Sequence, residues 1–298
     1  MNEGVFRVLN ALGHGREVSR TEALRRSAEA HSVLTDLSKS KAKWFDVAGE
    51  SFKLSNVGLA ALAREAHARK PALSVDALVE KLRELTRERP AVKRELDQVH
   101  ATLESVAKRA RILVERGDVQ RGLLLFGDDD LTALAVGLLL DEKGDDKKLT
   151  VLDLDDEILA FYEGHARIQT VKHDLREPLP SKLRNRFGTV FSDPPYASAG
   201  FGLFAARAVQ ALKADGRLYM QLGFSRRARE RGLAKQRLLL DMGFLVEAAE
   251  PFAAHYDGAE SIGSVSTLLT LAVTPQTKAP NEEALRVAGE AGLYTRTS

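Results

Sequence analysis

Hydrophobic positions along the chain follow different patterns in two successive regions. From residue 4 to about residue 70, apolar residues recur at helical spacing in "GVFRVLNALG", "SRTEALRRSA" and "AHSVLTDLSKSKAKW". A short hairpin with a glycine turn and another helix follow in "FDVAGESFKLSNVGLAALARE". Three helices and then a hairpin is the order of a winged helix, so residues 1–70 are predicted to form a small winged-helix-like α+β domain.

The second region begins with two long, charged helical patterns, after Pro71 and after Pro90, which predict a helical linker at residues 71–118. Over residues 119–275 short apolar runs alternate with helices, as in a doubly wound parallel sheet of the Rossmann-like, class I methyltransferase type. The predicted strands are, in order, "GLLLF", "KKLTVLDLD", "IQTVKHDL", "GTVFSDPPY", "RLYMQLGF", and "FLVEAAEPF" with "VSTLLTLAV" as an antiparallel pair. Residues 276–298 are predicted to be a flexible tail.

Composition narrows the class of protein without naming a function. The chain has 298 residues, a formal net charge of +2 and no cysteine, so disulfides and thiolate metal sites are excluded and nucleic acid is not an obligatory partner. No secretory pattern and no apolar run of about 20 residues is present, and we expect a cytoplasmic protein with no membrane partner. Two roles stay open for the first domain: it binds DNA, or it serves in packing and dimerisation. The candidate DNA-binding residues are Arg25, Arg26, Lys39, Lys41 and Lys43.

Acidic residues follow four of the predicted strands. In an open parallel sheet the ligand lies at the carboxyl ends of the strands, so these acids are candidate site residues. Asp153, with Asp155 beside it, has the placement of an acid that accepts hydrogen bonds from the ribose hydroxyls of an adenosyl cofactor. Asp174 is expected near the adenine amine. Capping of the following helix is the alternative for each of these acids.

The stretch "SDPPY", residues 192–196, predicts a rigid turn that projects Asp193 and Tyr196 into one crevice. It matches the Asp-Pro-Pro-Tyr motif of amino methyltransferases. In that motif the acid and a prolyl carbonyl hold the amine that is alkylated, and the aromatic ring stacks on its carrier. We therefore expect an amine substrate. Pro194 is expected among the cofactor-binding residues.

Three consecutive carboxylates, Asp128, Asp129 and Asp130, follow Gly127 where related folds keep a glycine-rich turn for the carboxylate of S-adenosylmethionine. Two unit charges about 4 Å apart interact by roughly 1 to 4 kcal/mol near a protein surface, so this turn disfavours an anionic donor. It favours decarboxylated S-adenosylmethionine and a polyamine such as spermidine. Asp129 or Asp128, with Asp193, is expected to take the proton of the attacking amine. Capping explains one or two of the three charges.

A further candidate is the helical stretch that contains Asp97, Gln98, Ala101, Thr102, Lys108 and Arg109. Its polar side chains either contact a substrate or form a solvated helix face, and a charged face is the usual outcome.

The segments "GDDDLTALA", "SDPPY" and "HYDGAESIGS" (residues 255–264), preceded by "LDQVHATLESVAKRA", resemble the branched-chain polyamine synthases, or bis(aminopropyl)spermidine synthases. The resemblance covers most of the chain. It implies the transfer of two aminopropyl groups from decarboxylated S-adenosylmethionine to the central nitrogen of spermidine, releasing methylthioadenosine, with no metal. It also implies a homodimer, a catalytic acid at Asp129 or Asp128, polyamine binding by Glu260 and an aromatic wall at Tyr256. Asp130, a flanking carboxylate of the acidic turn, is expected to bind the polyamine as well.

Two other functions remain open at this point. The first is an amine methyltransferase that uses intact S-adenosylmethionine on nucleic acid or protein, which the "DPPY" turn and the N-terminal domain favour. The second is a winged-helix regulator whose Rossmann-like domain senses a polyamine without catalysis. The acids at four strand ends argue against a nucleic-acid cleft.

Overall fold

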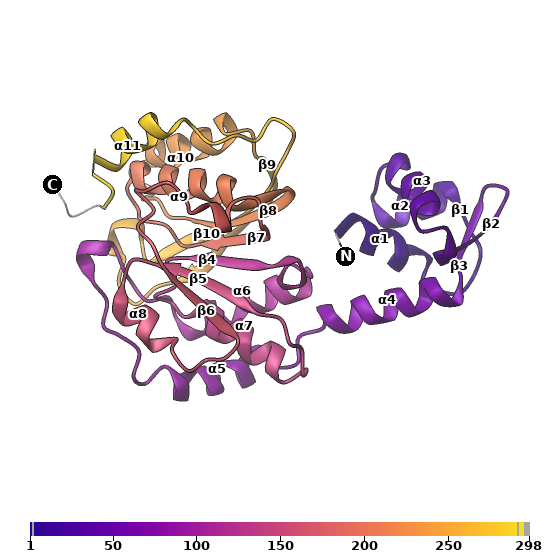
Figure 1. Cartoon of the computed structure of the whole chain (residues 1–298), viewed down its shortest axis with the longest axis horizontal. Coiled ribbons are helices and arrows are strands. Elements are labelled where there is room, and N and C mark those ends of the chain that lie inside the picture. The colour runs from indigo at the N-terminus through magenta and orange to yellow at the C-terminus, as the bar shows by residue number, and fades with distance from the viewer. Residues whose placement is uncertain (2, 291, 295–298) are drawn as a thin grey trace. The chain divides into compact units, whose positions relative to one another are not determined.

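The computed structural model describes residues 1, 3–290 and 292–294. They group into two compact units, described separately here (Figure 1): Met1–Pro71 with Val114–Arg121, and Ala72–Leu113 with Gly122–Ser298.

The first unit is a small α+β module. Its strands form an antiparallel three-stranded sheet in the order β1-β3-β2. Leu9, Leu12, Leu34 and Phe52 are buried in its core. Its elements are α1 (Glu3–Leu12), β1 (Val18–Ser19), α2 (Arg20–Ser27), α3 (His31–Ser40), β2 (Phe45–Ala48), β3 (Ser51–Leu54) and α4 (Asn56–Arg69), with a 3-10 turn at Ala42–Trp44.

The second unit is a seven-stranded sheet covered by helices. Its strands are β4 (Leu123–Phe126), β5 (Leu149–Asp153), β6 (Ile168–Lys172), β7 (Phe187–Ser192), β8 (Leu212–Leu222), β9 (Leu245–His255) and β10 (Val265–Ala272). The helices of this part of the chain are α5 (Val75–Leu85), α6 (Leu103–Glu115), α7 (Thr132–Asp141), α8 (Asp156–Phe161), α9 (Ser198–Ala211), α10 (Arg229–Asp241) and α11 (Glu282–Glu290). Short 3-10 turns lie at Arg94–Leu96, Val119–Arg121, Ser181–Leu183 and Glu260–Ile262.

The strand order is β6-β5-β4-β7-β8-β10-β9. The pairs from β6 to β8 are parallel, and β10 is antiparallel to both of its neighbours. This confirms the Rossmann-like prediction and its antiparallel pair. Strand order reverses between β4 and β7, so the turns after these two strands lie at the point where such sheets bind ligands.

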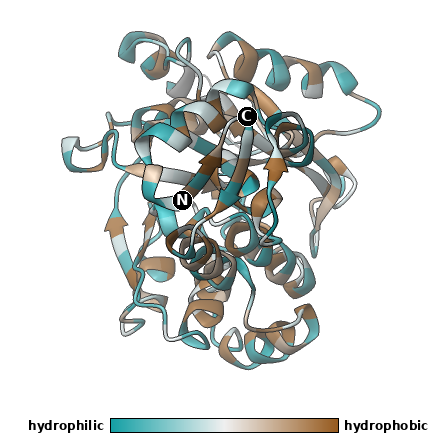
Figure 2. Cartoon of the chain, turned by 90° about the vertical axis from the view of Figure 1, so that its right-hand side faces the viewer, coloured by the Kyte–Doolittle hydropathy of each residue, from teal (hydrophilic) through white to brown (hydrophobic). Residues whose placement is uncertain are grey.

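Burial explains the hydrophobic pattern of the strands. All four residues of β4 are buried because the strand has neighbours on both sides and helices on both faces. The edge strand β9 is largely exposed. The helices are striped with hydrophobic and hydrophilic residues (Figure 2), and α5, for example, buries Leu78, Val79 and Leu82 on one side. Among the described residues, no helix is both long enough and apolar enough to cross a bilayer.

One prediction about the segments outside the sheet is wrong, and the flexibility of the tail stays a prediction. The helix expected directly after Pro90 begins only at Leu103: a 3-10 turn lies at Arg94–Leu96, Asp97 is left-handed with φ +58°, and Ala101 forms a β-bridge with Tyr256. The tail predicted to be flexible contains α11, which packs on α9 and buries Leu285. Residues 291 and 295–298 of that prediction lie outside the described residues.

Candidate active site

A pocket opens at the carboxyl ends of β4 to β7. Its acidic lining comes from five segments, at Asp97, Asp129, Asp153, Asp174 and Asp193. Gly127, Gln98, His173 and Pro195 also line it, and its apolar surface comes from Leu96, Leu152, Leu154, Leu175, Phe204 and Leu293, with Tyr294. Four of the acids are strand-end candidates from the sequence, and the structure brings them together.

The turn between β4 and α7 separates its three carboxylates. Gly127 has φ +64°, a left-handed conformation that favours glycine, and it starts the turn. The Asp128 side chain lies at the amino end of α7. Its carboxylate accepts hydrogen bonds from Thr132 N and Ala133 N, each at 2.8 Å, and from the Tyr162 hydroxyl at 2.6 Å. Burial raises the pKa of Asp128 to about 6, against the opposing effect of the Tyr162 hydrogen bond. The structure thus gives Asp128 a capping role on α7, and its role as the catalytic acid stays a prediction.

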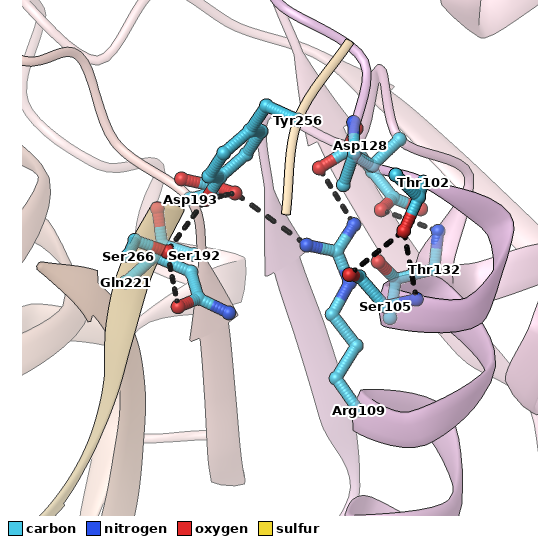
Figure 3. A network of polar contacts seen from close by, with 12 residues as sticks. Thr102, Ser105, Arg109, Asp128, Thr132, Ser192, Asp193, Gln221, Tyr256 and Ser266 are labelled. Atoms are coloured by element: carbon cyan, nitrogen blue, oxygen red, sulfur yellow. Dashed lines mark hydrogen bonds and ion pairs between the residues drawn. The ribbon is translucent and has the colours of Figure 1, made fainter. Parts of the chain in front are cut away.

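Asp130 is bound to other parts of the protein. Its carboxylate accepts a hydrogen bond from Ala101 N at 2.5 Å and forms an ion pair with Arg109, Nη2 to Oδ2, at 2.7 Å. The Arg109 side chain extends from α6 between the two acidic turns, which follow β4 and β7 (Figure 3), and its Nη1 lies 3.4 Å from Asp193 Oδ2. One buried guanidinium thus compensates a carboxylate in each turn, and polyamine binding by Asp130 stays a prediction.

Asp129 is the carboxylate of this turn that lines the pocket. Within the part of the chain that the structure describes, no group forms a hydrogen bond or ion pair with its side chain. Burial, followed by the charges of Asp130, Asp153 and Asp193, raises the pKa of Asp129 well above its ordinary value. A carboxyl group with a raised pKa and no internal partner is suited to accept a proton from a bound amine.

Asp193, in the turn after β7, belongs to a chain of hydrogen bonds (Figure 3). The Tyr256 hydroxyl donates to Asp193 Oδ2 at 2.7 Å and also lies 2.7 Å from Ser266 Oγ, which donates to Gln221 at 2.8 Å. Burial and then the charge of Asp130 raise the pKa of Asp193 to about 7, although Arg109 opposes this shift. Tyr256 is 6% exposed and holds Asp193 in place, and the aromatic wall expected at Tyr256 stays a prediction.

The remaining residues of the "DPPY" turn differ in position. Pro195 lines the pocket, whereas the predicted Pro194 is buried beside it. Tyr196 is half-buried, and its ring lies 3.3 Å from the place where a Cβ on Gly223 would stand. Burial, then the charge of Asp193, raises the pKa of Tyr196, which keeps its hydroxyl protonated.

Asp153 and Asp155 have different surroundings although they are two residues apart. Asp153 lines the pocket, and its two oxygens accept hydrogen bonds from Asp128 N at 3.1 Å and Asp155 N at 2.9 Å. Each oxygen keeps a lone pair for a ligand hydroxyl. Asp155 caps α8 through Glu157 N at 3.0 Å and binds Lys93 at 2.5 Å. Asp155 therefore has the alternative capping role, and its contact with the cofactor stays a prediction.

Asp174 lines the pocket at the end of β6, as expected for an acid near the adenine edge. Its carboxylate also accepts from Arg176 N and Nε at 2.9 and 3.0 Å. Burial by itself would raise the pKa of Asp174, but the hydrogen bonds from Arg176 hold it below its ordinary value.

Glu260 lies apart from these acids. It is exposed and lines a second cavity together with Phe224, Arg226 and Phe252. Arg226 stacks on the Phe252 ring at 5.6 Å. The structure therefore does not place Glu260 among the lining residues of the acidic pocket.

The sequence patterns did not predict three residues of the site: Arg109, Leu293 and Tyr294. Arg109 was weighed against a solvated helix face, yet it is 2% exposed and pairs with both acidic turns. Leu293 and Tyr294 were assigned to a flexible tail, yet both line the pocket. The available signal for Arg109 was its position on the apolar side of α6, near Val106, Ala110 and Leu113.

Comparison with known proteins identifies the family. The C-terminal domain of branched-chain polyamine synthase A matches residues 77–286. The chain belongs to the branched-chain polyamine synthase family. This confirms the resemblance carried by the "GDDD", "DPPY" and "HYDGAESIGS" segments.

Individual relatives are similar over part of their length. A segment of 146 residues is 34% identical to the N(4)-bis(aminopropyl)spermidine synthase of Thermococcus kodakarensis, covering 47% of this chain and 40% of that protein. An uncharacterised protein of Methanocaldococcus jannaschii is 35% identical over 200 residues, or 65% of this chain and 50% of that protein. The chain thus matches half or less of the length of these curated relatives.

A solved structure extends the comparison to the first unit. The branched-chain polyamine synthase from Thermus thermophilus, in complex with N4-aminopropylspermidine and 5′-methylthioadenosine, is 25% identical to this chain with a TM-score of 0.61. The superposition covers 94% of this chain and 89% of that one.

Proposed function

We propose that the protein is an aminopropyltransferase of the N4-bis(aminopropyl)spermidine synthase type. It transfers aminopropyl groups from decarboxylated S-adenosylmethionine to the secondary amine of spermidine, giving a branched, quaternary polyamine and methylthioadenosine. The observation that carries the proposal is the Asp129 carboxylate, which has a raised pKa and faces a pocket lined by four further acids. The family and the ligands named for the Thermus thermophilus synthase support the same reaction.

In the first transfer, the neutral secondary nitrogen of spermidine attacks the methylene carbon next to the sulfonium. The N–C bond forms as the C–S bond breaks, methylthioadenosine leaves as a neutral thioether, and the positive charge moves to nitrogen. Asp129 accepts the proton of the resulting tertiary ammonium, so that the nitrogen regains its lone pair. A second attack on a second donor gives the quaternary ammonium, which has no proton to lose.

Other acids of the pocket serve the two substrates. Asp153 accepts from the ribose hydroxyls of the donor and Asp174 from its adenine amine. Asp193, held by Tyr256 and Arg109, orients the attacking amine from the opposite side of the pocket to β5 and β6. Asp128 and Asp130 already have internal partners. The repulsion of a donor that carries a carboxylate is therefore weaker than three free carboxylates would give.

One observation favours a second candidate, an amine methyltransferase that uses intact S-adenosylmethionine. Arg89 is half-buried near Asp130, Asp257 and Asp129, and its Nη1 is buried with no hydrogen-bond partner in the described chain. A guanidinium beside the acidic turn is the kind of group that would donate hydrogen bonds to the carboxylate of S-adenosylmethionine.

Donor choice tests the two candidates directly. Purified protein is incubated with spermidine and either donor, and the products are separated by mass spectrometry. We expect masses that increase by one and then two aminopropyl groups with decarboxylated S-adenosylmethionine, and no product with the intact donor. Methylated spermidine would instead support the methyltransferase, and binding of spermidine without any product would support a polyamine-sensing regulator.

We also propose that the first unit is a winged helix, because α1, α2 and α3 are followed by the β2–β3 hairpin. A homodimer without nucleic acid completes the proposal. The edge strand β9 exposes Leu245, Val246 and Phe252, which a second copy could cover. Light scattering on the full chain, with and without added duplex DNA, distinguishes a dimer from a monomer and from a DNA complex.

A further inference from the structure

Two described residues that follow α11 lie at the pocket on the carboxyl edge of the sheet. Helix α11 packs on α9 (Figure 1), and Leu293 and Tyr294 then line the same pocket as Asp153 and Asp174. Leu293 is 6% exposed, so its side chain is part of the core and not a surface residue.

A single buried arginine joins this segment to the adenine side of the pocket. Arg207 of α9 is fully buried and donates from Nε to the carbonyl oxygen of Leu175 at 2.8 Å and from Nη2 to that of Arg176 at 3.1 Å. Its Nη1 donates to both oxygens of Glu282, the first residue of α11, at 2.9 and 2.8 Å. The loop that follows Asp174 and the start of α11 are therefore fixed by the same guanidinium.

A glycine at the start of α9 allows the segment to approach closely. A Cβ on Gly200 would lie 2.4 Å from the carbonyl oxygen of Leu293 and 2.8 Å from Cβ of Pro195. A contact of 2.4 Å to a backbone atom cannot be relieved by a change of rotamer. The backbone at Leu293 thus lies directly on the first turn of α9, next to the "DPPY" turn.

Tyr294 completes this side of the pocket. Burial, then the charge of Asp174, raises the pKa of Tyr294 to about 12, so its hydroxyl stays neutral near that acid. Leu152, Leu175 and Phe204 supply further apolar surface, while Asp153 and Asp174 supply acceptors. Apolar and aromatic surface beside carboxylates is what a purine nucleoside requires, since its base stacks and its amine and hydroxyls donate hydrogen bonds.

We infer that the segment comprising α11, Leu293 and Tyr294 forms one wall of the donor's nucleoside site. The Tyr294 ring lies against the purine, and the contact between Arg207 and Glu282 positions the segment. The inference rests on the proposed function in one respect, namely that the donor is an adenine nucleoside. It assigns the segment to the donor and not to the polyamine.

The test is calorimetric binding of 5′-methylthioadenosine and, separately, of spermidine to the 298-residue chain and its variants. Tyr294→Ala is expected to weaken 5′-methylthioadenosine about 10- to 100-fold, the range of a lost base–aromatic stack, and to change spermidine less than about twofold. Tyr294→Phe keeps the ring and should bind the nucleoside within about threefold of the parent protein. Arg286→Ala is the matched control, because Arg286 is exposed on α11 and pairs only with Glu283 and Glu290 in the described chain.

A chain that ends at Glu290 gives a second readout if Tyr294→Ala fails to fold, which a thermal melt would detect. It removes Leu293 and Tyr294 and keeps Arg207–Glu282, and it should lose nucleoside affinity at least as strongly as Tyr294→Ala.

Two results would overturn the inference and leave the proposed function standing: unchanged nucleoside affinity in both variants, or a loss confined to spermidine. A parent protein that binds no 5′-methylthioadenosine would overturn the proposed function as well.

Discussion

The turns after β4 and β7 follow adjacent parallel strands and carry the same functional group, yet they use it differently. The β4 turn has three aspartates with three different surroundings: Asp128 caps a helix, Asp130 pairs with Arg109, and Asp129 faces the pocket. The β7 turn has one aspartate, Asp193, which lines the pocket and is also held by Tyr256 and Arg109.

The difference shows that internal partners decide what a carboxylate can do. Asp128 accepts three hydrogen bonds and has little capacity left for a ligand. Asp129 is without such partners in the described part of the chain, so binding of an amine costs it no internal contact. Arg109 connects the turns, because it offsets the charge of Asp130 and Asp193 together and allows acids to gather in one buried region.

The largest expected effect comes from Asp129. Asp129→Asn keeps the shape of the turn and removes the proton acceptor, so kcat should fall on the order of 10²- to 10⁴-fold. The affinity of Asp129→Asn for 5′-methylthioadenosine should stay within about threefold of that of the parent protein. Asp153→Ala, in contrast, should weaken the binding of 5′-methylthioadenosine as its first effect. Steady-state kinetics and calorimetry measure the two quantities. Asp156→Asn, which changes an exposed carboxylate paired with Lys172, is the control.

If Asp129→Asn retained the kcat of the parent protein, the contrast between the two turns would have to be abandoned and Asp193 would become the candidate base.

A smaller effect on stability is expected at Asp128. Asp128→Ala leaves two backbone N–H groups and the Tyr162 hydroxyl without their acceptor, and the free energy of unfolding should fall by about 2–4 kcal/mol. Tyr162→Phe removes one of the three bonds and should cost about 1 kcal/mol. Urea denaturation measures both. A loss of turnover in Asp128→Ala at unchanged stability would mean that the acid acts in the reaction.

The smallest effect is a change in how stability depends on pH. The pKa of Asp193 is raised to about 7 in the folded protein, so between about pH 4 and pH 7 the folded chain holds a proton that the unfolded chain has lost. This contribution to stability is complete below about pH 4 and is lost as the pH rises through 7. Asp128 and Asp129 act in the same direction.

Asp193→Asn cannot ionise, so its unfolding free energy should fall less steeply over this range, by up to about 1 kcal/mol per pH unit. Thermal and urea unfolding at pH 4, 5, 6 and 7 measure the slope, with Asp156→Asn as the control. A slope identical to that of the parent protein would show that Asp193 is ionised throughout.

Much of the fold and of the pocket could be predicted from the sequence, because it depends on local patterns. Buried runs such as Leu123–Phe126 gave the strands, and the acids directly after them gave Asp129, Asp153, Asp174 and Asp193 as lining residues. Strand ends meet at one edge of a parallel sheet whatever the details of packing, so these positions follow from topology.

The exceptions depend on contacts between distant segments. Asp155 and Asp153 are indistinguishable by pattern, and Lys93 is what binds one of them away from the pocket. The helix predicted directly after Pro90 begins only at Leu103, and Ala101 before it pairs with Tyr256, which lies 155 positions later in the chain.

By itself, the sequence determined the doubly wound sheet, the acids at its carboxyl edge and the family, because periodicity, strand ends and motifs are local properties. Only the tertiary structure decided which carboxylates remain available to a ligand, that Arg109 joins the two acidic turns, and that Leu293 and Tyr294 belong to the pocket. The physical reason is that the charge state and orientation of a buried group depend on the partners that folding places around it, and those partners are far away in sequence.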